Sequence, residues 1–393
     1  MTDRTIGVAV IGGGMAGRAH AAGYRMASTL FGTHRPDVRL VAIADANKAV
    51  ADDTAKRYGY ERAEYDWQAI AEASDIDVVS VVVANHLHRE MVEGLLAAGK
   101  HVLCEKPLAG SAADAEAMLL AAERADSLAV VGYTYRRSPA VEQIRRELAA
   151  GTVGELVHFN GHYWCDYGLD PSSPITWRHR GGPGTGALAD VGSHLIDLSE
   201  FVCGPITEVS GATFHTLITE RPVPVGTTYG HTKAEVTGEM APVENEDVAT
   251  FTATFANGAV GTFSASRVAH ALPDGLGFEL FGSQGSASWQ LFRASEYEIS
   301  VVGDRPELSG PRRVIIGPDH PYIRGGLPMD AGGVGHGKAE FFAYQARAFL
   351  DQVAGIDGGL APVPDFATGV HSMRTVAAIT ESGLGGGATV KVS

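Results

Sequence analysis

An acid and a histidine share the motif DVGSH, within residues 184–197 of the sequence, GTGALADVGSHLID. The pattern predicts that this segment enters a helix, where residues four apart, such as Asp190 and His194, lie on one face with Asp197 close by. A carboxylate beside an imidazole, away from the buried stripe of a helix, can act as an acid/base pair. The alternative is a histidine that is satisfied inside a helix interface. The separate apolar stripe consists of Val191, Leu195, Leu198 and Val202.

Two further polar segments follow predicted strands. Asn85, His86 and His88 come after one buried strand, and Glu105 and Lys106 end the next one. Both segments are expected at the carboxyl ends of parallel strands, where open α/β sheets bind their ligands. A surface ion pair is the alternative for the second segment. A metal site is the alternative for the two histidines, but no spacing supplies a third ligand, so we expect no metal.

A glycine-rich turn comes directly after the first predicted strand and opens a helix. Its glycines, Gly12, Gly14 and Gly17, fit the pattern G-x-G-x-x-G, which allows a tight turn, a close approach of backbone to pyrophosphate, and close packing of helix on strand. Met15 and Ala16 complete the motif and begin the helix, whose N-terminus favours phosphate. The segment therefore predicts a dinucleotide site.

Asp45 ends the second predicted strand, at the place where this type of site has an acid for the adenosine ribose. A 2′-phosphate would face the carboxylate, and two like charges about 4 Å apart repel by about 4 kcal/mol at an effective dielectric of 20. We therefore expect NAD rather than NADP. The alternatives are that Asp45 only caps the next helix, and that Lys48 admits NADP.

The elements that must position these residues alternate in the first third of the chain. Short β-branched runs and helical patterns take turns, which is typical of a parallel sheet covered by helices on both faces. The predicted strands are residues 8–11, 40–44, 78–83, 101–104 and 129–132, and the predicted helices are residues 16–27, 48–58, 89–98 and 112–125.

The pattern changes near residue 137 to long alternating strands, with a hairpin signal at Asn257 and Gly258 and a tight turn at residues 282–285. We predict an α/β protein with a Rossmann domain in residues 1–137. Residues 138–393 should form a second α+β domain with an open, mostly antiparallel sheet that binds substrate and forms oligomers. Long loops are expected at residues 221–243 and 304–335, and helices at residues 338–353 and 366–381.

Composition excludes several classes of protein. The 46 acidic and 31 basic residues give a formal charge of -15, with no basic stripe for nucleic acid or an anionic membrane. Three widely spaced cysteines argue against a disulfide framework and favour a reducing compartment. Neither a secretion signal nor a bilayer-spanning run is visible. We expect a soluble, cytoplasmic protein with a small-molecule substrate.

Taken together, the motifs resemble the Gfo/Idh/MocA family, named for glucose-fructose oxidoreductase and inositol dehydrogenase. The resemblance covers nearly the whole chain and rests on GGGMAG, NHLHREMVEGLLAAGKHVLCEKPLA, GYTYRRSPA, the WR pair at 177–178, and GALADVGSHLID. The segments SSPITWR, FANGAVG and GPDHPY look most like its branch of levoglucosan and sugar 3-dehydrogenases. Thr134 departs from the family pattern, in which many members have Asn, so a substrate contact there is in doubt.

The resemblance implies a catalytic trio of Lys106, Asp190 and His194. Histidine titrates near neutral pH, so His194 is the better general base, Asp190 would orient it, and Lys106 would donate a hydrogen bond to the forming carbonyl oxygen. Around the cofactor the resemblance implies Asn85, His88, Glu105, Trp177 and Arg178, and around the substrate Tyr135 and Arg136. Trp164, Asp166, Tyr167 and Trp177 could line a sugar site by stacking and hydrogen bonding, although buried aromatics often only pack a core.

The expected function is NAD-dependent oxidation of a secondary hydroxyl, of the C3 type, in a sugar, an anhydrosugar such as levoglucosan, or an inositol. Two alternatives stay open: an NAD-dependent glycoside hydrolase of the same fold, and a non-catalytic NAD-binding regulator. The segments FTATFA and AVGTFSASR would form an antiparallel sheet. Helices of the same chain can cover only one face of such a sheet. We therefore expect a homo-oligomer, a dimer or tetramer, packed sheet to sheet.

Overall fold

The structure is a computed structural model that describes residues 5–32, 35–226, 235–303, 310–334 and 336–393. It forms two compact units, Met1–Pro139 with Ile316–Met373, and Ala140–Ile315 with Arg374–Ser393. The first unit thus ends two residues after the predicted boundary at 137. The predicted second domain, residues 138–393, is not one continuous unit, because Ile316–Met373 packs with the N-terminal residues.

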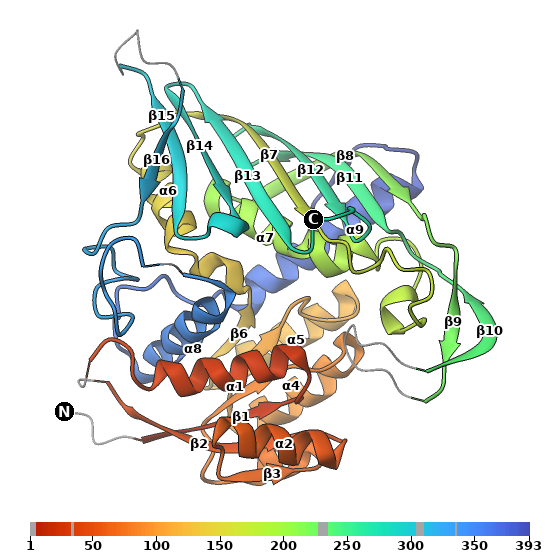
Figure 1. Cartoon of the computed structure of the whole chain (residues 1–393), viewed down its shortest axis with the longest axis vertical. Coiled ribbons are helices and arrows are strands. Elements are labelled where there is room, and N and C mark those ends of the chain that lie inside the picture. Colours follow the sequence, from red (N-terminus) through yellow and green to blue (C-terminus); the bar gives the residue numbers. More distant parts are fainter. Residues whose placement is uncertain (1–4, 33–34, 227–234, 304–309, 335) are drawn as a thin grey trace. The chain divides into compact units, whose positions relative to one another are not determined.

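The first unit contains a six-stranded parallel sheet in the order β3-β2-β1-β4-β5-β6, the Rossmann arrangement expected from the sequence (Figure 1). Its central strands β1, β4 and β5 are buried on both faces, which explains their continuous apolar runs. They are β1 (Thr5–Ile11), β2 (Asp37–Ala44), β3 (Arg62–Glu64), β4 (Val78–Val81), β5 (His101–Glu105) and β6 (Ala129–Gly132).

Helices cover both faces of this sheet. One buried cluster joins the strands to the helices of residues 67–124 and to the first turns of α9; the other joins them to α1, α2 and α8. Helix α8 belongs here because Ala346, Phe349 and Leu350 pack into the second cluster. The helices are α1 (Met15–Ala27), α2 (Lys48–Tyr58), α3 (Trp67–Glu72), α4 (His88–Ala97), α5 (Ala112–Arg124), α8 (Lys338–Ala354) and α9 (Phe366–Leu384).

The second unit contains a nine-stranded sheet in the order β16-β15-β14-β13-β7-β12-β11-β8-β17. Every neighbouring pair is antiparallel except β12 and β7, so the prediction of a mostly antiparallel sheet is confirmed. Its strands are β7 (Leu156–Trp164), β8 (Ile206–His215), β11 (Val248–Phe255), β12 (Val260–Ser266), β13 (Gly275–Gly282), β14 (Gly285–Gln290), β15 (Glu296–Val301), β16 (Arg312–Ile315) and β17 (Val390–Lys391).

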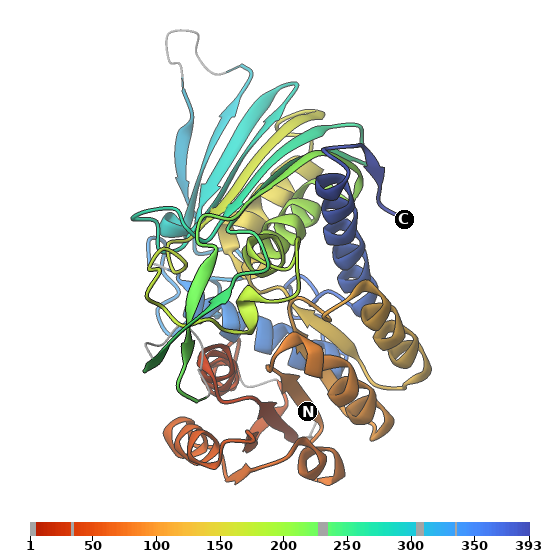
Figure 2. The same ribbon diagram turned by 90° about the vertical axis from the view of Figure 1, so that its right-hand side faces the viewer.

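Helices lie on one face of this sheet, which we call the inner face (Figure 2). Residues such as Phe159 and Phe251 point to it and are buried, and α7 (Ser193–Cys203) packs there, next to α6 (Pro139–Ala149), whose Arg145 lies over the Phe201 ring. The opposite, outer face is mostly hydroxyl-bearing: Thr252 bonds Ser210, and Thr262 bonds Asn160.

Two local expectations differ from the structure. The loop expected at residues 221–243 contains most of a separate hairpin, β9 (Glu220–Pro224) and β10 (Val236–Pro242), with residues 227–234 outside the described part. The loop expected at residues 304–335 includes strand β16; its residues 304–309 and 335 are not described. Within the described residues, none of the helices combines the length and apolar character that crossing a membrane requires.

Candidate active site

The glycine turn between β1 and α1 has the geometry that a dinucleotide needs. Gly12 has a φ of +103°, and a Cβ there would lie 2.0 Å from the Val82 carbonyl oxygen; a Cβ at Gly17 would lie 1.7 Å from the oxygen of Gly12. A side chain is therefore excluded at both positions. At Gly14, which caps α1, a Cβ would meet nothing within 4 Å, so the backbone is open to a ligand. The turn fits the pyrophosphate of NAD at a helix N-terminus, where Met15 is 63% exposed.

Asp45 lies at the carboxyl end of β2 and is tied to this turn. Its Oδ2 accepts a hydrogen bond from the Gly13 backbone amide at 2.8 Å, and its Oδ1 accepts one from the Asn47 amide at 2.8 Å. Each carboxylate oxygen has a second lone pair, so both contacts are compatible with a ribose hydroxyl as an additional donor. Helix α2 is capped by Asn47, not by Asp45, which removes the capping alternative.

Glu105, at the end of β5, links α1 to the residue that follows it. His20 Nε2 lies 2.8 Å from Glu105 Oε1, and the Lys106 backbone amide donates to Oε2 at 3.0 Å. Both His20 and Glu105 are buried, and despite its burial the hydrogen bonds and the nearby positive charges lower the pKa of Glu105. The buried pair therefore fixes the backbone from which the Lys106 side chain emerges.

His88 lies in the interior of the first unit, although it was expected beside the nicotinamide ribose. It is fully buried, with Nδ1 3.1 Å from the Leu108 carbonyl oxygen and Nε2 3.2 Å from that of Val83, and burial lowers its pKa. A neutral imidazole has one N–H, so it donates to one of these oxygens. A ribose cannot reach this side chain directly, and His88 instead connects the segments after β4 and β5. Asn85 begins the short helical turn of Asn85–Leu87 and is half-buried.

The segment after β6 is more buried than a principal substrate contact would be. Tyr135 is 3% exposed, and the Lys338 ammonium lies 5.2 Å from its ring centroid; Arg136 is 9% exposed and lies over the Tyr133 ring. Thr134, the departure from the family pattern, donates to Gln345 Oε1 at 3.2 Å. The structure thus gives Thr134 a partner inside its own unit and leaves little of Tyr135 and Arg136 for a sugar.

In the second unit, Asp190 lies on a π-helical turn, Leu188–Gly192, that leads into α7. The regular α-helical spacing assumed for Asp190 and His194 therefore does not hold over the first part of the motif. The Tyr167 hydroxyl donates to Asp190 Oδ2 at 2.5 Å, and Arg178 Nε lies 4.0 Å from the same oxygen. His194 is half-buried, 6.0 Å from the Tyr163 ring, whereas Asp197 is buried. The predicted stripe is confirmed as the buried side: Val191, Leu195, Leu198 and Val202 are all 5% exposed or less.

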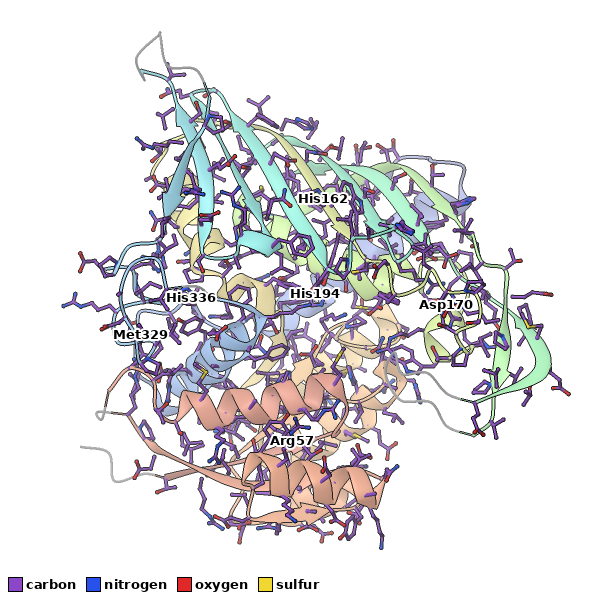
Figure 3. All side chains as sticks on the ribbon, viewed as in Figure 1. Arg57, His162, Asp170, His194, Met329 and His336 are labelled. Carbon is purple, nitrogen blue, oxygen red and sulfur yellow. The ribbon has the colours of Figure 1, made fainter. Side chains whose placement is uncertain are left out.

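Trp164 does not lie with His194, which corrects its assignment to the substrate site. Successive strand residues point to opposite faces, and Tyr163 faces His194 on the inner side. Trp164 therefore points to the outer face, where its ring stacks on that of His162 with 3.9 Å between the ring centroids, and its Nε1 donates to Ser264. Figure 3 labels His162 on the sheet and His194 below it. Among the other candidates, Asp166 is half-buried in the next loop, and Trp177 is 46% exposed with the Arg178 guanidinium over its ring.

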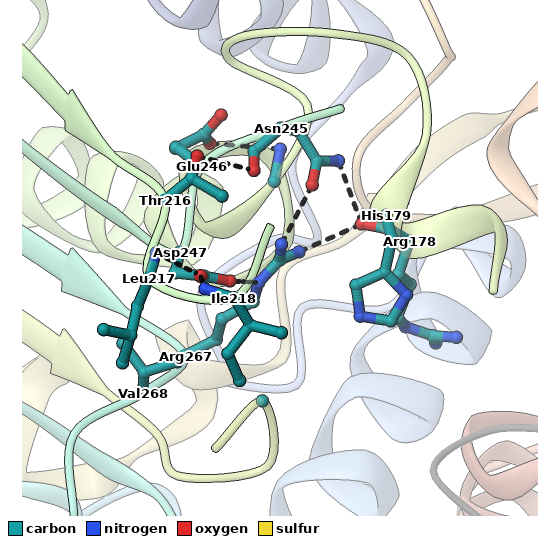
Figure 4. A network of polar contacts seen from close by, with 12 residues as sticks. Arg178, His179, Thr216, Leu217, Ile218, Asn245, Glu246, Asp247, Arg267 and Val268 are labelled. Atoms are coloured by element: carbon teal, nitrogen blue, oxygen red, sulfur yellow. Dashed lines mark hydrogen bonds and ion pairs between the residues drawn. The ribbon is translucent and has the colours of Figure 1, made fainter. Parts of the chain in front are cut away.

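A buried polar network, missed from the sequence, holds the backbone around this site (Figure 4). The Arg178 carbonyl oxygen accepts hydrogen bonds from Asn245 Nδ2 at 2.9 Å and from Arg267 Nη1 at 3.0 Å. Arg267 also pairs with Asp247 at 2.7 Å, with both side chains only 1% exposed. Burial and the charges of Arg267 and Arg221 lower the pKa of His179 to about 3, so its Nδ1 can accept from the Thr176 amide.

The buried carboxylate of Glu246 is a second polar group that was not predicted from the sequence. Its carboxylate accepts hydrogen bonds from the backbone amides of Gly184 at 2.8 Å and of Gly186 and Leu188 at 3.0 Å each. The side chain is buried, and its burial raises its pKa. The acidic run VENED before β11 was the only signal in the sequence, and it does not reveal that its partners lie about 60 residues earlier.

Comparison with known proteins identifies the family. Residues 6–133 match the oxidoreductase family with an NAD-binding Rossmann fold, and residues 141–288 match the GFO/IDH/MocA C-terminal domain. The chain belongs to the Gfo/Idh/MocA oxidoreductases. It is an NAD-dependent oxidoreductase that acts on CH–OH groups.

Several relatives in the family are named as dehydrogenases of sugars and inositols. Levoglucosan dehydrogenase of Pseudarthrobacter phenanthrenivorans is 36% identical over 96% of both chains. The D-glucoside 3-dehydrogenase of Escherichia coli is 30% identical over 56% of this chain and 61% of its own. Solved structures of levoglucosan dehydrogenase in complex with NADH, and with NADH and levoglucosan, each give a TM-score of 0.89 at 32% and 33% identity, covering 99% of this chain and 100% of theirs. This chain therefore lies among the NAD-binding sugar and cyclitol dehydrogenases.

Among the described residues, no cluster of three or more His, Cys, Asp or Glu is placed to hold a metal ion.

Proposed function

We propose that this enzyme oxidises a secondary hydroxyl, of the C3 type, in a sugar, an anhydrosugar such as levoglucosan, or an inositol. The observation that carries the proposal is the setting of Asp190, whose carboxylate is held by Tyr167 and Arg178 while the apolar residues of the same helix are buried. The similarity to levoglucosan dehydrogenase over almost the full length of both chains supports this substrate class.

Lys106, Asp190 and His194 are proposed to carry the chemistry. His194 accepts the proton of the substrate hydroxyl, and Asp190 stabilises the imidazolium that forms. The Lys106 ammonium donates a hydrogen bond to the substrate oxygen as it becomes a carbonyl oxygen. Bound NAD supplies the hydride acceptor, so the products are a ketone, NADH and one proton.

Around this trio the proposed binding residues differ in how well they fit. Gly12, Gly14, Gly17 and Asp45 fit a dinucleotide, and Asn85 and Glu105 stay candidates at the ends of strands β4 and β5. The exposed Trp177 ring and Arg178 are retained as candidate cofactor contacts, and the half-buried Asp166 as a candidate substrate contact. His88 and Trp164 are withdrawn because of where their side chains point.

The test is NADH absorbance after the enzyme is mixed with NAD and a panel of sugars, anhydrosugars, glycosides and inositols. Stoichiometric NADH and a keto product support the dehydrogenase. Release of an aglycone with flat absorbance would mean the glycoside hydrolase, because the hydride would return to the substrate. NAD binding with no turnover on any of these compounds would favour a regulator.

Two properties belong to the same proposal. The three cysteines are buried and free of disulfides, which suits a reducing cytoplasm.

We also expect a homo-oligomer packed through the outer face, where Val260 and Phe281 are 52% and 43% exposed. A monomer at micromolar concentration in light scattering would contradict that assembly.

A further inference from the structure

We infer that Tyr167 is a positioning residue for Asp190: its hydroxyl keeps the Asp190 carboxylate ionised and in one orientation. The inference rests on the proposed function, because it concerns a residue of the proposed trio. Tyr167 lies in the loop after β7 and contributes its phenol from outside helix α7. The bond from its hydroxyl to Asp190 Oδ2 is 2.5 Å long, as short as charge-assisted O–H···O⁻ bonds are.

The direction of this bond is settled by the surroundings of the phenol. Burial and the negative charge of Asp190 raise the pKa of Tyr167 well above its ordinary value, although Arg267 acts in the opposite direction. Tyr167 therefore stays protonated at any pH at which the enzyme would work. The phenol is the donor, and the ionised carboxylate is the form of Asp190 that it stabilises.

The Tyr167 backbone is fixed on both sides, so its phenol is held in place before substrate arrives. The Cys165 amide donates to the Ser266 carbonyl oxygen, and the Gly168 amide to that of Arg267, both at 2.8 Å. A Cβ at Gly168 would lie 2.7 Å from the same Arg267 oxygen, which shows how closely the two segments pack. The Arg221 guanidinium also donates to the Gly168 carbonyl oxygen from the other side.

Asp190 is fixed from the side of its backbone by a different set of contacts. Its amide donates to the Gly186 carbonyl oxygen at 3.0 Å, and Glu246 holds the amides of Gly186 and Leu188. Tyr167 and Arg178 then act on one carboxylate oxygen, Oδ2, which limits rotation of the carboxylate about its Cβ–Cγ bond. The backbone contacts set where Asp190 is, and Tyr167 sets how its carboxylate is turned.

The charged and titratable groups that face this pair come from several elements. Arg178 lies 4.0 Å from Asp190 Oδ2, and Arg267 and Cys165 act on the Tyr167 phenol. His194 lies in the first turn of α7, directly after the π-helical turn that carries Asp190. Loss of the phenol hydroxyl removes a hydrogen-bond donor to the ionised carboxylate and makes Asp190 easier to protonate, so the acid limb of activity should move to higher pH.

The experiment compares Tyr167→Phe with wild type, with Asp190→Asn, and with Tyr65→Phe as the matched control. Tyr65 also donates to a carboxylate, that of Asp52 at 3.1 Å, but on the exposed surface of the first unit. We expect Tyr167→Phe to lower kcat roughly tenfold or more, as loss of a hydrogen bond to a charged group does. The acid limb of kcat/KM should move up by about one pH unit, with the KM for NAD unchanged. Tyr65→Phe should change none of these quantities.

A second measurement does not depend on activity. In protein with ¹³C-labelled aspartate carboxyl groups, the resonance that disappears in Asp190→Asn reports the titration of Asp190. Its midpoint should be higher in Tyr167→Phe than in wild type, and an unchanged midpoint would overturn the inference. The proposed function fails separately, if wild type oxidises none of the compounds or if Asp190→Asn keeps full turnover. A Tyr167→Phe enzyme with wild-type kcat and pH profile, beside an impaired Asp190→Asn enzyme, overturns the inference alone.

Discussion

Asp45 Oδ2 accepts a hydrogen bond from the backbone amide of Gly13 at 2.8 Å, so the acid that we assign to the adenosine ribose also holds the glycine turn. We predict that Asp45→Ser raises the KM for NAD and improves the use of NADP, because a carboxylate repels a 2′-phosphate. Asp45→Asn should shift the preference less, since its side-chain oxygen can still accept one of the two amides. The measurement is the ratio of kcat/KM for the two cofactors. A wild-type enzyme that used both equally would refute the assignment of Asp45.

Local features of the sequence predicted the geometry of the glycine turn and the position of Asp45 at the end of its strand. The positive φ of Gly12 and the close contacts at Gly12 and Gly17 are consequences of the turn itself, and the strand before it is adjacent in the chain. Asp45 could be assigned for the same reason, because it ends the neighbouring strand. Each of these inferences uses residues whose geometry is set within one strand, turn and helix.

One local signal was not used in the prediction for Trp164: on β7 it shares a face with the polar residues His158, Asn160 and His162, whereas Tyr163 shares a face with Phe159.

Features that depend on distant packing were not predictable in this way. Glu246 reaches amides about 60 residues earlier in the chain, and helix α8 returns to the first unit after about 180 residues spent in the second. Such pairings are chosen by the packing of the whole unit, which no local pattern encodes.

Glu246 should stabilise the entry to α7 and support turnover at the same time. In Glu246→Gln one acceptor oxygen is replaced by an NH₂ donor, which faces backbone amides and leaves at least one of them unsatisfied, at a cost of about 1–3 kcal/mol. We expect a lower Tm and a lower kcat, with NAD affinity retained, by thermal unfolding and steady-state kinetics. The matched control is Glu244→Gln, which loses an exposed ion pair with Arg180 and should change both quantities little. A Glu246→Gln enzyme with the Tm of wild type would show that the buried carboxylate is dispensable.

His179 should make the stability of the protein depend on pH below neutrality. Its pKa is lowered from 6.5 to about 3 by burial and by Arg267 and Arg221, so the unfolded chain binds a proton that the folded protein does not. The contribution of His179 to the free energy of unfolding is complete above about pH 6.5. As the pH falls toward 3, the free energy of unfolding decreases by up to about 4 kcal/mol. His179→Asn keeps an acceptor for the Thr176 amide but does not titrate, so its free energy of unfolding should fall less between pH 6.5 and pH 4. Parallel curves for the two proteins in urea titrations would contradict the low pKa of His179.

His194 and Lys106 are predicted to act on chemistry rather than on folding. The stripe of Val191, Leu195 and Leu198 is buried without help from the His194 side chain, so His194→Ala should keep nearly the Tm and NAD affinity of wild type. Its kcat should fall by ~10² to 10⁴, the usual contribution of a general base, and that of Asp190→Ala should fall less. Lys106→Ala should lose at least as much, because it removes a charge beside the reacting oxygen. His158→Ala is the control, since this histidine stacks on Phe281 on the outer face. A His194→Ala enzyme that folds, binds NAD and turns over at a near-normal rate would exclude His194 as the base.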